Sequence, residues 1–533
     1  MKRVHQSRNL PHHQYVSKPK PFTVVNEFVW NAAALRAFIA ERFEGEQVLV
    51  VSNRQPFSHC YGESGVEITV PASGLVSALE PVLRACDGTW IAHGSGDADR
   101  SNVDDRDRCR APTGEFKYTL RRIWLPPSDE KKYYDGFANG ALWPLCHDTS
   151  VPPTFKIAEW DAYRRVNRMF ADSVVEEATC VDPIVLVQDY HLALVPAMIC
   201  ARLPRARIIS FWHIPWASWQ RMSLCPWIES LIEGLLGSSI MGFQTTVDAQ
   251  NFLDLTAVRS YQVSVVGDSV ERREKSTRVR CFPISVAWPE PIPFAATALE
   301  CRREVHARWN LSENGRLIVG VDRFDYSKGL LERLHALERL LSDEPEWLGR
   351  LTLVQIAAPS RIALPAYARF RAQVFSEVAR INDLFAYGSY RPIVWVDEQH
   401  SHESVNSLLR AAEVCLVTSL RDGMNLVCKE FIASRDDEQG VLVLSQFAGA
   451  AAELPEALIV DPANTAQVAA AIHSALTMPR CEQTARMRQM RATVRRNNVH
   501  RWAAEMLLDC SRLSSSPGTN AKDDVSTAPR LAA

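Results

Sequence analysis

Short runs of apolar residues recur along the chain, and each gives way to a polar turn and then to a segment with helical periodicity. The runs lie at residues 48–51, 184–187, 208–212, 239–243, 317–321, 351–356, 414–417 and 441–444. Runs of this kind, most clearly the unbroken apolar run 414–417, are typical of parallel strands that are buried on both faces. Helical patterns lie between them, for example over 161–178 and 227–236. The alternation predicts an α/β fold built on doubly wound parallel sheets.

The stretch 413–454 shows this repeating unit most clearly. Its strand-like run leads into the polar turn 419–423 and then into a helical segment, for which Asn425 is the expected N-cap. A second apolar run follows, and residues 446–451 resemble the start of another helix that is rich in small side chains. In open parallel sheets, ligands bind beyond the carboxyl ends of the strands, and helix N-termini there attract anions. This turn is therefore a candidate ligand site.

The turn carries groups that suit a sugar joined to a phosphate. Asp422 and Glu430 are acceptors for hydroxyl groups, and the backbone N–H groups of residues 423–426 are donors for phosphate oxygens. The competing interpretation is a structural turn with a capped helix and a solvated Glu430.

Length and proline placement predict two domains with unstructured ends. At 533 residues the chain is too long for one ordinary hydrophobic core. Prolines cluster over residues 283–293, where we expect a linker. The predicted division is a disordered arm over 1–22, an N-terminal Rossmann-like domain over 23–290, a C-terminal Rossmann-like domain over 291–485, a helix over 486–512 that packs back towards the first domain, and a disordered tail over 513–533.

Composition removes several classes of partner from consideration. A net charge of −2 with 23% charged residues gives no electrostatic case for binding nucleic acid or a membrane surface. No apolar run reaches the roughly 18 residues that a membrane span requires, and no apolar core of a signal peptide follows the N-terminus. The thirteen cysteines show neither CxxC pairs nor zinc-ligand spacing, so we expect reduced thiols in a cytoplasmic protein.

Polar and charged side chains stand just past the ends of the predicted strands in both halves of the chain. They are Arg54, Asp189, His191, His213, Gln244, Arg323, Lys328, Arg361 and Asp422. Two Rossmann-like sheets that face each other would direct all of them into one cleft, where we predict the site. Because loops are polar in general, coincidence is the competing explanation.

The charges suggest roles within such a cleft. Arg323 and Lys328 lie on one strand-to-helix turn, and Gly329 allows close approach of the backbone, so the pair suits a diphosphate. Arg54 and Arg361 form a second cationic pair, one from each half of the chain, and suit a second phosphate. Ordinary surface cations and interdomain ion pairs are the alternatives.

Between these cations lie groups that suit a reacting sugar. Asp189 and His213 are candidates for recognising hydroxyl groups, although a histidine at a strand end is as often a core or capping residue. Tyr134 and Trp143 are candidates for lining a sugar pocket, with plain core packing as the alternative.

We predict no metal site and no cofactor. Asp97 and Asp99 have the spacing of a metal-binding DxD triplet, but they stand in a polar loop and we interpret them as solvated. No paired carboxylates of the glycosidase kind stand out. No GxGxxG follows an early strand, which argues against a dinucleotide-dependent oxidoreductase.

Several segments together resemble the motifs of trehalose-6-phosphate synthases. They are SNR (52–54), YYDGFANGALWP (133–144), QDYH (188–191), FWHIPW (211–216), GFQT (242–245), DRFDYSKGL (322–330), SLRDGMNLVCKE (419–430) and GVLVLSQFAGAAAEL (440–454). They occur in the family's order and cover roughly residues 45–510. The resemblance implies two facing Rossmann-like domains of the GT-B type, with the active site in the cleft between them.

The resemblance also implies an activity and a site. The chain would be a retaining glycosyltransferase that moves glucose from a nucleotide sugar, usually UDP-glucose, to glucose 6-phosphate and so forms α,α-trehalose 6-phosphate. The implied donor-binding residues are His213, Arg323, Lys328, Asp422, Gly423, Met424, Asn425, Leu426, Val427 and Glu430. The implied acceptor-binding residues are Arg54, Gly74, Tyr134, Trp143, Asp189 and Arg361. The implied catalytic set, which contains no protein nucleophile, is Asp189, His213, Arg323, Lys328 and Asp422.

Two departures from the family pattern touch the acceptor side. Ser73 stands where a glycine is usual, and His93 stands where a tryptophan is frequent. A relative that transfers glucose to glycerol 3-phosphate, such as a glucosylglycerol-phosphate synthase, therefore stays open as an alternative. So does a catalytically silent homologue that binds sugar phosphates. The sequence leaves the nucleotide open between UDP, GDP and ADP, and it is compatible with a homo-oligomer.

Overall fold

The structure is a computed structural model that describes residues 28–514. Within this range 44, 64, 71–73, 112–117, 260–262, 273–274, 290–295, 313 and 399 are not described. The predicted arm (1–22), residues 290–293 of the proline-rich linker, Ser73 and nearly all of the predicted tail (513–533) lie outside the described residues.

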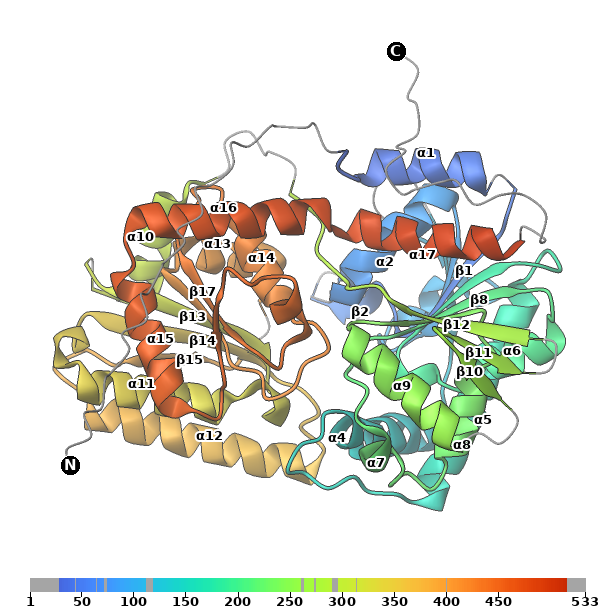
Figure 1. Cartoon of the computed structure of the whole chain (residues 1–533), viewed down its shortest axis with the longest axis horizontal. Helices are drawn as coiled ribbons and strands as arrows, with labels where there is room; N and C mark the ends of the chain where they lie inside the picture. Colours follow the sequence, from blue (N-terminus) through green and yellow to red (C-terminus); the bar gives the residue numbers. More distant parts are fainter. Residues whose placement is uncertain are drawn as a thin grey trace, which may run out of the picture.

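Two open sheets with helices packed around them form two lobes that lie side by side (Figure 1). The ten-stranded sheet of the N-terminal lobe has the order β10-β11-β12-β9-β8-β7-β1-β4-β6-β5. Its strands pair in parallel from β12 to β6, and both edges pair antiparallel. The strands are β1 (Val48–Arg54), β4 (Thr89–His93), β5 (Arg108–Arg110), β6 (Thr119–Ile123), β7 (Ile184–Gln188), β8 (Arg207–Trp212), β9 (Ile240–Phe243), β10 (Ser264–Val266), β11 (Ser269–Arg272) and β12 (Lys275–Cys281).

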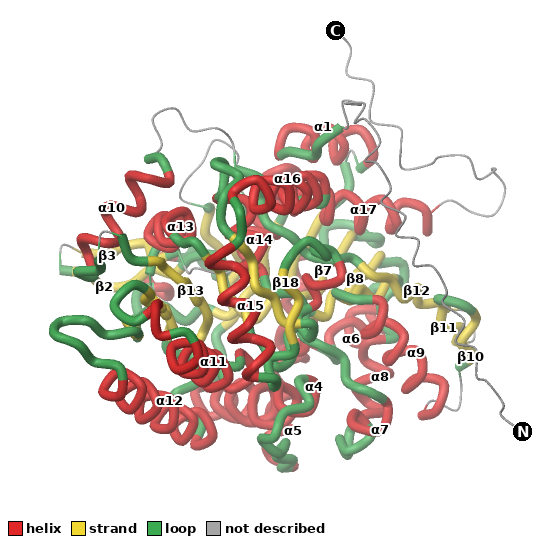
Figure 2. Tube along the Cα trace, turned by 60° about the vertical axis from the view of Figure 1, so that its left-hand side comes forward, coloured by secondary structure: helices red, strands yellow, loops and turns green. Residues whose placement is uncertain are grey.

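Helices and one separate hairpin complete this lobe (Figure 2). The helices are α1 (Ala32–Arg42), α2 (Gly74–Cys86), α3 (Pro127–Glu130), α4 (Trp143–Cys146), α5 (Ile157–Glu177), α6 (Val195–Arg202), α7 (Trp219–Met222), α8 (Ile228–Leu235), α9 (Thr246–Arg259) and, from the far end of the described chain, α17 (Val499–Ser514). Shorter helices are η1 (Asp99–Asn102), the π-helix η2 (Lys131–Leu142) and η3 (Tyr190–Leu192). The strands β2 (Ser58–Gly62) and β3 (Gly65–Thr69) form the hairpin.

The C-terminal lobe contains a fully parallel sheet with the order β15-β14-β13-β16-β17-β18. Its strands are β13 (Arg316–Arg323), β14 (Leu351–Ala358), β15 (Ile393–Val396), β16 (Val414–Val417), β17 (Val441–Ser445) and β18 (Leu458–Val460). Its helices are α10 (Ala298–Arg308), α11 (Leu330–Asp343), α12 (Pro365–Leu384), α13 (His402–Ala411), α14 (Leu426–Ser434), α15 (Thr465–Thr477) and α16 (Arg480–Arg496), with the short η4 (Tyr326–Lys328), η5 (Pro345–Trp347) and η6 (Gly449–Ala452). The expected doubly wound parallel sheets are thus confirmed.

Two local expectations were wrong. Residues 446–451 do not begin an α-helix but lead into the single 3₁₀ turn η6. Gly449 there approaches the backbone of Gly423 so closely that an added Cβ would meet the carbonyl oxygen of Gly423. The single helix expected over 486–512 is two helices, α16 and α17, separated at residues 497–498. The predicted domain limit at 485 falls inside α16, and the domain limits remain a prediction.

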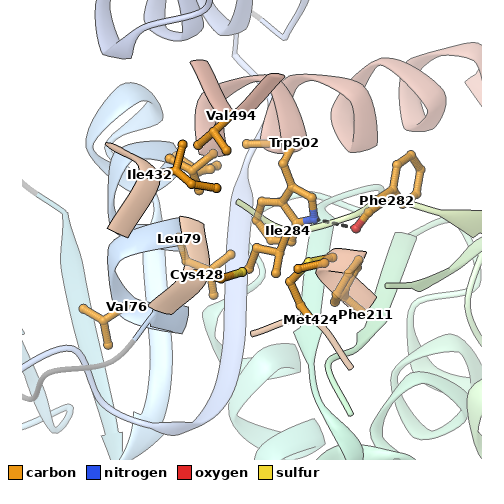
Figure 3. Packing of buried hydrophobic residues seen from close by; sticks show 14 of the residues in the cluster. Val76, Leu79, Phe211, Phe282, Ile284, Met424, Cys428, Ile432, Val494 and Trp502 are labelled. Atoms are coloured by element: carbon orange, nitrogen blue, oxygen red, sulfur yellow. Dashed lines mark hydrogen bonds between the residues drawn. The ribbon is translucent and has the colours of Figure 1, made fainter. Parts of the chain in front are cut away.

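The hydrophobic core continues from one lobe into the other. Phe211 and Phe282 of the N-terminal lobe belong to the same buried cluster as Met424 and Cys428 of the C-terminal lobe (Figure 3). Trp502 on α17 joins this cluster: its ring meets Phe211 edge to face, with centroids 5.3 Å apart, and its Nε1 donates a hydrogen bond of 3.2 Å to the carbonyl oxygen of Phe282. The two lobes therefore share packed apolar surface at the base of the space between them.

All thirteen cysteines lie in the described residues and all are free thiols, as expected from their scattered positions. Burial raises the pKa of several of them, such as Cys225 and Cys428, each to about 12, so these thiols stay protonated at neutral pH. Within the part of the chain that the structure describes, no helix combines the length and the apolar character that crossing a membrane demands.

Candidate active site

Each sheet has one point at which the strand order reverses. In the N-terminal lobe the chain runs outward from β1 through β4 to β6 on one side, and from β7 through β8 to β9 on the other. In the C-terminal lobe the corresponding neighbours are β13 and β16. Ligands of doubly wound sheets bind at the carboxyl ends of the strands that flank such a point. Arg54 ends β1, Asp189 follows β7, Arg323 ends β13 and Asp422 lies beyond β16, so the candidate residues come from these two openings.

Two adjoining cavities of about 630 and 300 Å³ lie between the lobes. Both are lined by Arg54, Tyr134, Asp189, His213, Arg323, Lys328, Arg361 and Asp422. The larger cavity adds Gln244, Met424, Asn425, Leu426, Val427 and Glu430, and the smaller one adds Trp143 and His191. Among the predicted site residues whose surroundings the structure describes, it brings together all except Gly423; the side-chain surroundings of Gly74, at the start of α2, are not described. Gly423 lies where the lobes touch, and an added Cβ would meet the carbonyl oxygen of His213.

The cationic turn after β13 contacts the acidic turn after β16. Lys328 Nζ donates a hydrogen bond of 2.6 Å to Asp422 Oδ2, and Asn425 Nδ2 donates to the same oxygen at 3.2 Å. Burial opposes ionisation of Asp422, but the Lys328 ammonium and the Asn425 amide outweigh it and hold the pKa of this carboxyl below its ordinary value. Gly329 follows at φ +64, and an added Cβ there would meet the carbonyl oxygen of Thr418. A glycine is needed to bring these two turns together.

Arg361 contacts aromatic side chains of the opposite lobe across the cleft. Its Nη1 donates to Asp325 Oδ2 at 2.9 Å and to the hydroxyl of Tyr367 at 2.6 Å, both within the C-terminal lobe. Its guanidinium carbon lies 3.7 Å from the ring centroid of Trp143, and Nη2 donates to Tyr190 Oη at 3.2 Å, both across the cleft. The alternative of an interdomain ion pair is wrong for Arg361, because its carboxylate partner lies in its own lobe.

Asp189 holds two histidines at the centre of the cleft. It adopts φ +76, a conformation that non-glycine residues rarely adopt. Its Oδ1 accepts a hydrogen bond of 3.2 Å from the backbone N–H of His213, and its Oδ2 lies 3.6 Å from His191 Nδ1. Burial would raise the pKa of Asp189, but the two imidazoles outweigh it and the pKa falls below its ordinary value. Burial lowers the pKa of His213 to about 4, so this imidazole is neutral at working pH.

The turn before α14 presents its backbone to the larger cavity. Asn425 caps the helix as predicted: its side chain accepts a hydrogen bond from the backbone N–H of Cys428 at 3.2 Å, and its φ is +82. Backbone bonds from Asp422 N to Phe447 O and from Ala450 N to Met424 O fix the turn against the neighbouring loop. Burial raises the pKa of Glu430, which lines the same cavity one helical turn further along.

The strand-end pattern missed several residues of the site. His147 stacks on Trp143 with ring centroids 3.9 Å apart, lines the smaller cavity, and has a pKa lowered to about 4 by burial. Its position four residues after Trp143, on the same helical face, was an available signal. Asp325 and Tyr190 stand inside the quoted motifs DRFDYSKGL and QDYH, but nothing in their spacing indicates that both contact Arg361.

Two expectations outside the cleft need correction. Asp99 is not solvated: it is 0% exposed and lies 2.8 Å from Arg122 Nη2, so this carboxylate has a structural role, whereas Asp97 is exposed as predicted. His93 lines neither cavity, and its Nδ1 lies 3.2 Å from the carbonyl oxygen of Ile123. Among the described residues, Glu344, Glu346 and His473 form a group close enough together to hold a metal ion, and this group also lies outside both cavities.

Comparison with known proteins agrees with the fold and the cleft. The family model described as "Glycosyltransferase family 20" matches residues 46–512. The trehalose-6-phosphate synthase of Mycolicibacterium vanbaalenii is 37% identical over 478 residues, which cover 87% of this chain and 96% of that protein. The alpha,alpha-trehalose-phosphate synthase [UDP-forming] 2 of Aspergillus niger is 34% identical over 82% of this chain and 91% of its own length.

Solved structures of related enzymes share both lobes. A UDP-forming alpha,alpha-trehalose-phosphate synthase from Burkholderia xenovorans, in complex with glucose-6-phosphate, has a TM-score of 0.77 and 33% identity, covering 87% of this chain and 99% of that one. The E. coli protein bound with UDP-2-fluoro glucose has a TM-score of 0.76 and 32% identity over the same shares of the two chains. These matches confirm the predicted arrangement of two facing Rossmann-like sheets.

Proposed function

Because the chain belongs to glycosyltransferase family 20, we propose that it transfers glucose from UDP-glucose to glucose 6-phosphate and so forms α,α-trehalose 6-phosphate. The observation that carries this proposal is the meeting of Arg323, Lys328 and Arg361 from one lobe with Arg54 and Trp143 from the other around two adjoining cavities. A cleft with cations from both sides suits two phosphorylated substrates held at once. The names of the relatives and the two ligands of their solved structures support the same pair of substrates.

The larger cavity is the proposed donor site. Arg323 and Lys328 would bind the diphosphate, and the backbone of residues 423–425 with Asp422 and His213 would bind the glucose. Glu430 would accept hydrogen bonds from the ribose, with Leu426 and Val427 beside the nucleotide. The lining of the cavity and the cap at Asn425 support this arrangement, because they aim the start of α14 at the space where the diphosphate would lie.

The smaller cavity is the proposed acceptor site. Arg54, Tyr134, Trp143 and Arg361 would surround the phosphate of glucose 6-phosphate, and Asp189 would accept a hydrogen bond from its glucose ring. Gly74, at the start of α2, is proposed to approach the acceptor through its backbone. His93 does not line the cleft, so its departure from the family pattern gives no reason to prefer glycerol 3-phosphate.

The proposed chemistry needs alignment and a positive field rather than a protein nucleophile. The bond from the anomeric carbon to the diphosphate oxygen breaks, the acceptor hydroxyl oxygen bonds to the same face of that carbon, and the hydroxyl proton passes to the departing phosphate oxygen. Arg323 and Lys328 would stabilise the charge that develops on the diphosphate.

The carboxylates around the cavities support this mechanism, since most already have partners. Asp422 pairs with Lys328, and Asp325 with Arg361. Asp322 pairs with Arg333, and Asp189 contacts His191 and the backbone of His213. A cation beside a carboxylate weakens it as a nucleophile, so a double-displacement route through Asp422, Asp325 or Asp322 is disfavoured.

Nucleotide release by the purified chain tests the proposal. UDP-, GDP- and ADP-glucose would each be paired with glucose 6-phosphate or glycerol 3-phosphate. We expect UDP release with UDP-glucose and glucose 6-phosphate, together with a sugar phosphate whose two glucosyl units are α,α-linked by NMR. Release with glycerol 3-phosphate alone would move the function to that acceptor. Nucleotide binding without release in any pairing would identify a silent homologue.

Three further predictions accompany the function. The domain division at residues 290–291 is supported by the change from one sheet to the other between β12 and β13. The cytoplasm is the proposed location, supported by the free thiols, since a reducing compartment keeps cysteines in this state. A homo-oligomer remains a prediction, which light scattering of the purified chain would test.

A further inference from the structure

His213 lines both cavities, and each of its ring nitrogens lies beside a glutamine. Nε2 lies 2.8 Å from Gln188 Oε1, and Nδ1 lies 3.5 Å from Gln244 Nε2. His213 follows β8, whose two neighbours in the sheet are β7 and β9. Gln188 ends β7 and Gln244 follows β9, so the glutamines reach the ring from the strands on either side of its own.

The orientation of Gln244 is fixed by a group that can only donate. The backbone N–H of Ile284 donates a hydrogen bond of 3.0 Å to Gln244 Oε1. Because an amide carries its oxygen and nitrogen on opposite sides, the nitrogen of Gln244 must then face His213. An amide nitrogen donates and does not accept, so the Nδ1 that it faces presents a lone pair.

This orientation determines where the proton of His213 lies. A neutral imidazole carries one proton, and when Nδ1 presents a lone pair the proton lies on Nε2. There it points at Gln188 Oε1, which is an acceptor. The ring is neutral because burial lowers its pKa to about 4, although Asp189 acts in the opposite sense and His191 adds to the lowering.

Gln188 is fully buried, and within the described chain only the oxygen of its side-chain amide has a hydrogen-bond partner. It is 0% exposed, and its amide nitrogen is a buried atom without a partner among the described residues. A buried donor without a partner destabilises the folded chain. Gln188 is therefore held in an orientation in which its oxygen can accept a hydrogen bond from His213 Nε2, while its own amide nitrogen makes no hydrogen bond to any described residue.

We propose that Gln188 and Gln244 are positioning residues that hold His213 as the Nε2-protonated tautomer, so that Nδ1 is an acceptor for a hydroxyl group of the donor sugar. The bond from Gln244 is long, and this leaves the Nδ1 lone pair able to take a stronger donor. The role at the donor sugar rests on the proposed function, whereas the tautomer rests on the geometry of the ligand-free chain.

Nitrogen NMR of the full chain labelled with ¹⁵N-histidine tests the tautomer directly, without any activity. The His213 signals are identified by their absence in His213→Asn. We expect the pattern of a ring protonated on Nε2 at pH 7, and a mixture of the two neutral tautomers in Gln188→Leu. A ring protonated on Nδ1, or on both nitrogens, in the unmodified chain would overturn the proposal.

Kinetics of two substitutions at Gln188 test the positioning role. Gln188→Glu still accepts the Nε2 proton, but its negative charge raises the pKa of His213, so Nδ1 becomes protonated as the pH falls. At alkaline pH we expect kcat/KM of Gln188→Glu for UDP-glucose to be near that of the unmodified chain. On acidification its kcat/KM should begin to fall at a higher pH than in the unmodified chain. Gln188→Leu should lose about 10-fold or more in kcat/KM at every pH, since one hydrogen bond to the ring is gone.

The matched control is Gln47→Leu, because Gln47 lies at the opposite end of the same sheet and bonds to residues 177 and 179. Its loss should leave both the activity and its pH profile unchanged. A Gln188→Glu profile that superimposes on that of the unmodified chain, or full activity in Gln188→Leu, would refute the positioning role. If the chain proves inactive with UDP-glucose, the proposed function fails, and the NMR result still decides the tautomer.

UDP-glucose analogues test the acceptor role of Nδ1. Fluorine in place of a hydroxyl accepts weakly but cannot donate. We expect one singly fluorinated donor to bind the unmodified chain at least about 10-fold more weakly than UDP-glucose does. In His213→Ala the same fluorinated donor and UDP-glucose should bind equally well. Equal losses in both proteins at every position would contradict an acceptor role for Nδ1.

Discussion

At the scale of single residues, the cleft is built from charges that already have partners. Lys328 contacts Asp422, and Arg361 contacts Asp325. Both pairs are largely buried, so removing one member leaves the other as an uncompensated charge in a poorly solvated place. Substitutions here change the electrostatics of the remaining partner as well as removing a ligand for substrate.

Lys328→Ala should lower kcat/KM for UDP-glucose by about 10²–10³-fold, the usual loss when one group that stabilises a developing negative charge is removed. The remaining Asp422 carboxylate, next to the departing diphosphate and without its ammonium partner, adds to the loss. Steady-state UDP release measures the effect. Lys156→Ala is the control, since Lys156 pairs with Glu159 on the exposed surface, and a loss of similar size there would contradict the assignment.

Glu430 should produce a pH dependence of donor binding. Burial raises its pKa, so on acidification this carboxyl takes up a proton at a higher pH than an ordinary glutamate does. As a carboxylic acid it no longer accepts two hydrogen bonds from ribose hydroxyls. We therefore expect the dissociation constant for UDP to rise as the pH falls through this pKa, measured by calorimetry. In Glu430→Gln, UDP should bind more weakly, and its dissociation constant should no longer rise as the pH falls. If the rise on acidification is unchanged in this variant, another group causes it.

Much of the site could be predicted because parallel sheets place their ligands at strand ends. Arg54, Asp189, Arg323 and Asp422 each follow an apolar run that is visible in the sequence. His147 and Tyr367 could not be found in this way, since His147 follows a helix and Tyr367 lies on one, and tertiary packing brings them to Trp143 and Arg361. Asp99 was misinterpreted for the converse reason: its partner Arg122 lies within a strand, where a charge is not expected.

At the scale of elements, the strand-to-helix turns bring distant backbones into contact. Gly329 lies against Thr418, Gly423 against His213, and Gly449 against Gly423. Each is a position where an added Cβ would meet a backbone oxygen, which cannot move aside as a flexible side chain can. The turns after β13, β16 and β17 are therefore fixed to one another before any ligand binds.

Gly329→Ala and Gly349→Ala form a matched pair that isolates this contact. Both glycines have positive φ, +64 and +75, so both alanines suffer the left-handed strain of about 1–2 kcal/mol. An added Cβ meets the carbonyl oxygen of Thr418 at position 329 and nothing within 4 Å at position 349. We expect Gly329→Ala to be the less stable in denaturant unfolding and to lose most of its activity. Equal stability and activity in the two variants would show that the contact is relieved by small shifts.

Asn498 ends the break between α16 and α17 and holds it in place. Its side chain is 0% exposed, accepts from the backbone N–H groups of His500 and Arg501, and donates to the carbonyl oxygen of Trp30 at 2.7 Å. Asn498→Ala removes an N-cap, so we expect a loss of about 1–2 kcal/mol in the free energy of unfolding. Urea denaturation would measure it, with Asn464→Ala as the comparison, because Asn464 is an exposed N-cap at the start of α15. No loss at position 498 would show that water replaces the cap.

The predictable and unpredictable elements differ in how apolar they are. β1, β7, β8 and β9 of the first sheet and β13, β14, β16 and β17 of the second are rich in apolar residues and could be located from the sequence. β6, with the sequence TLRRI, carries two arginines and gives no such signal. The π-helix η2 is invisible to a search for the α-helical period, because its residues recur at a different spacing.

At the scale of the whole molecule, two buried clusters join the lobes. The cluster that contains Phe211, Met424 and Trp502 takes residues from both lobes. Tyr326 and Tyr367 of the C-terminal lobe belong to a second cluster, whose other buried members lie in the N-terminal lobe. Motion between the lobes is therefore expected to pivot on these shared clusters.

Ligands that bind both lobes should then draw them together. We expect the radius of gyration, from small-angle X-ray scattering, to fall when UDP and glucose 6-phosphate are added together. Arg361→Ala, which removes the contact to Trp143, should show a smaller fall or none. An unchanged radius in the unmodified chain with both ligands bound, as shown by calorimetry, would mean that the lobes are already closed.

The position of α17 has a consequence for how the chain is made. This helix follows every strand of the C-terminal lobe in sequence, yet it packs against α1, α2 and β8 of the N-terminal lobe and bonds through Asp509 to Arg280 of β12. During synthesis the first sheet therefore leaves the ribosome with an apolar face uncovered, and the segment that seals it is translated only after the second sheet. The lobe that is begun first is finished last, so a nascent chain that is cut short before residue 499 exposes that face to chaperones and proteases, although the second sheet is complete.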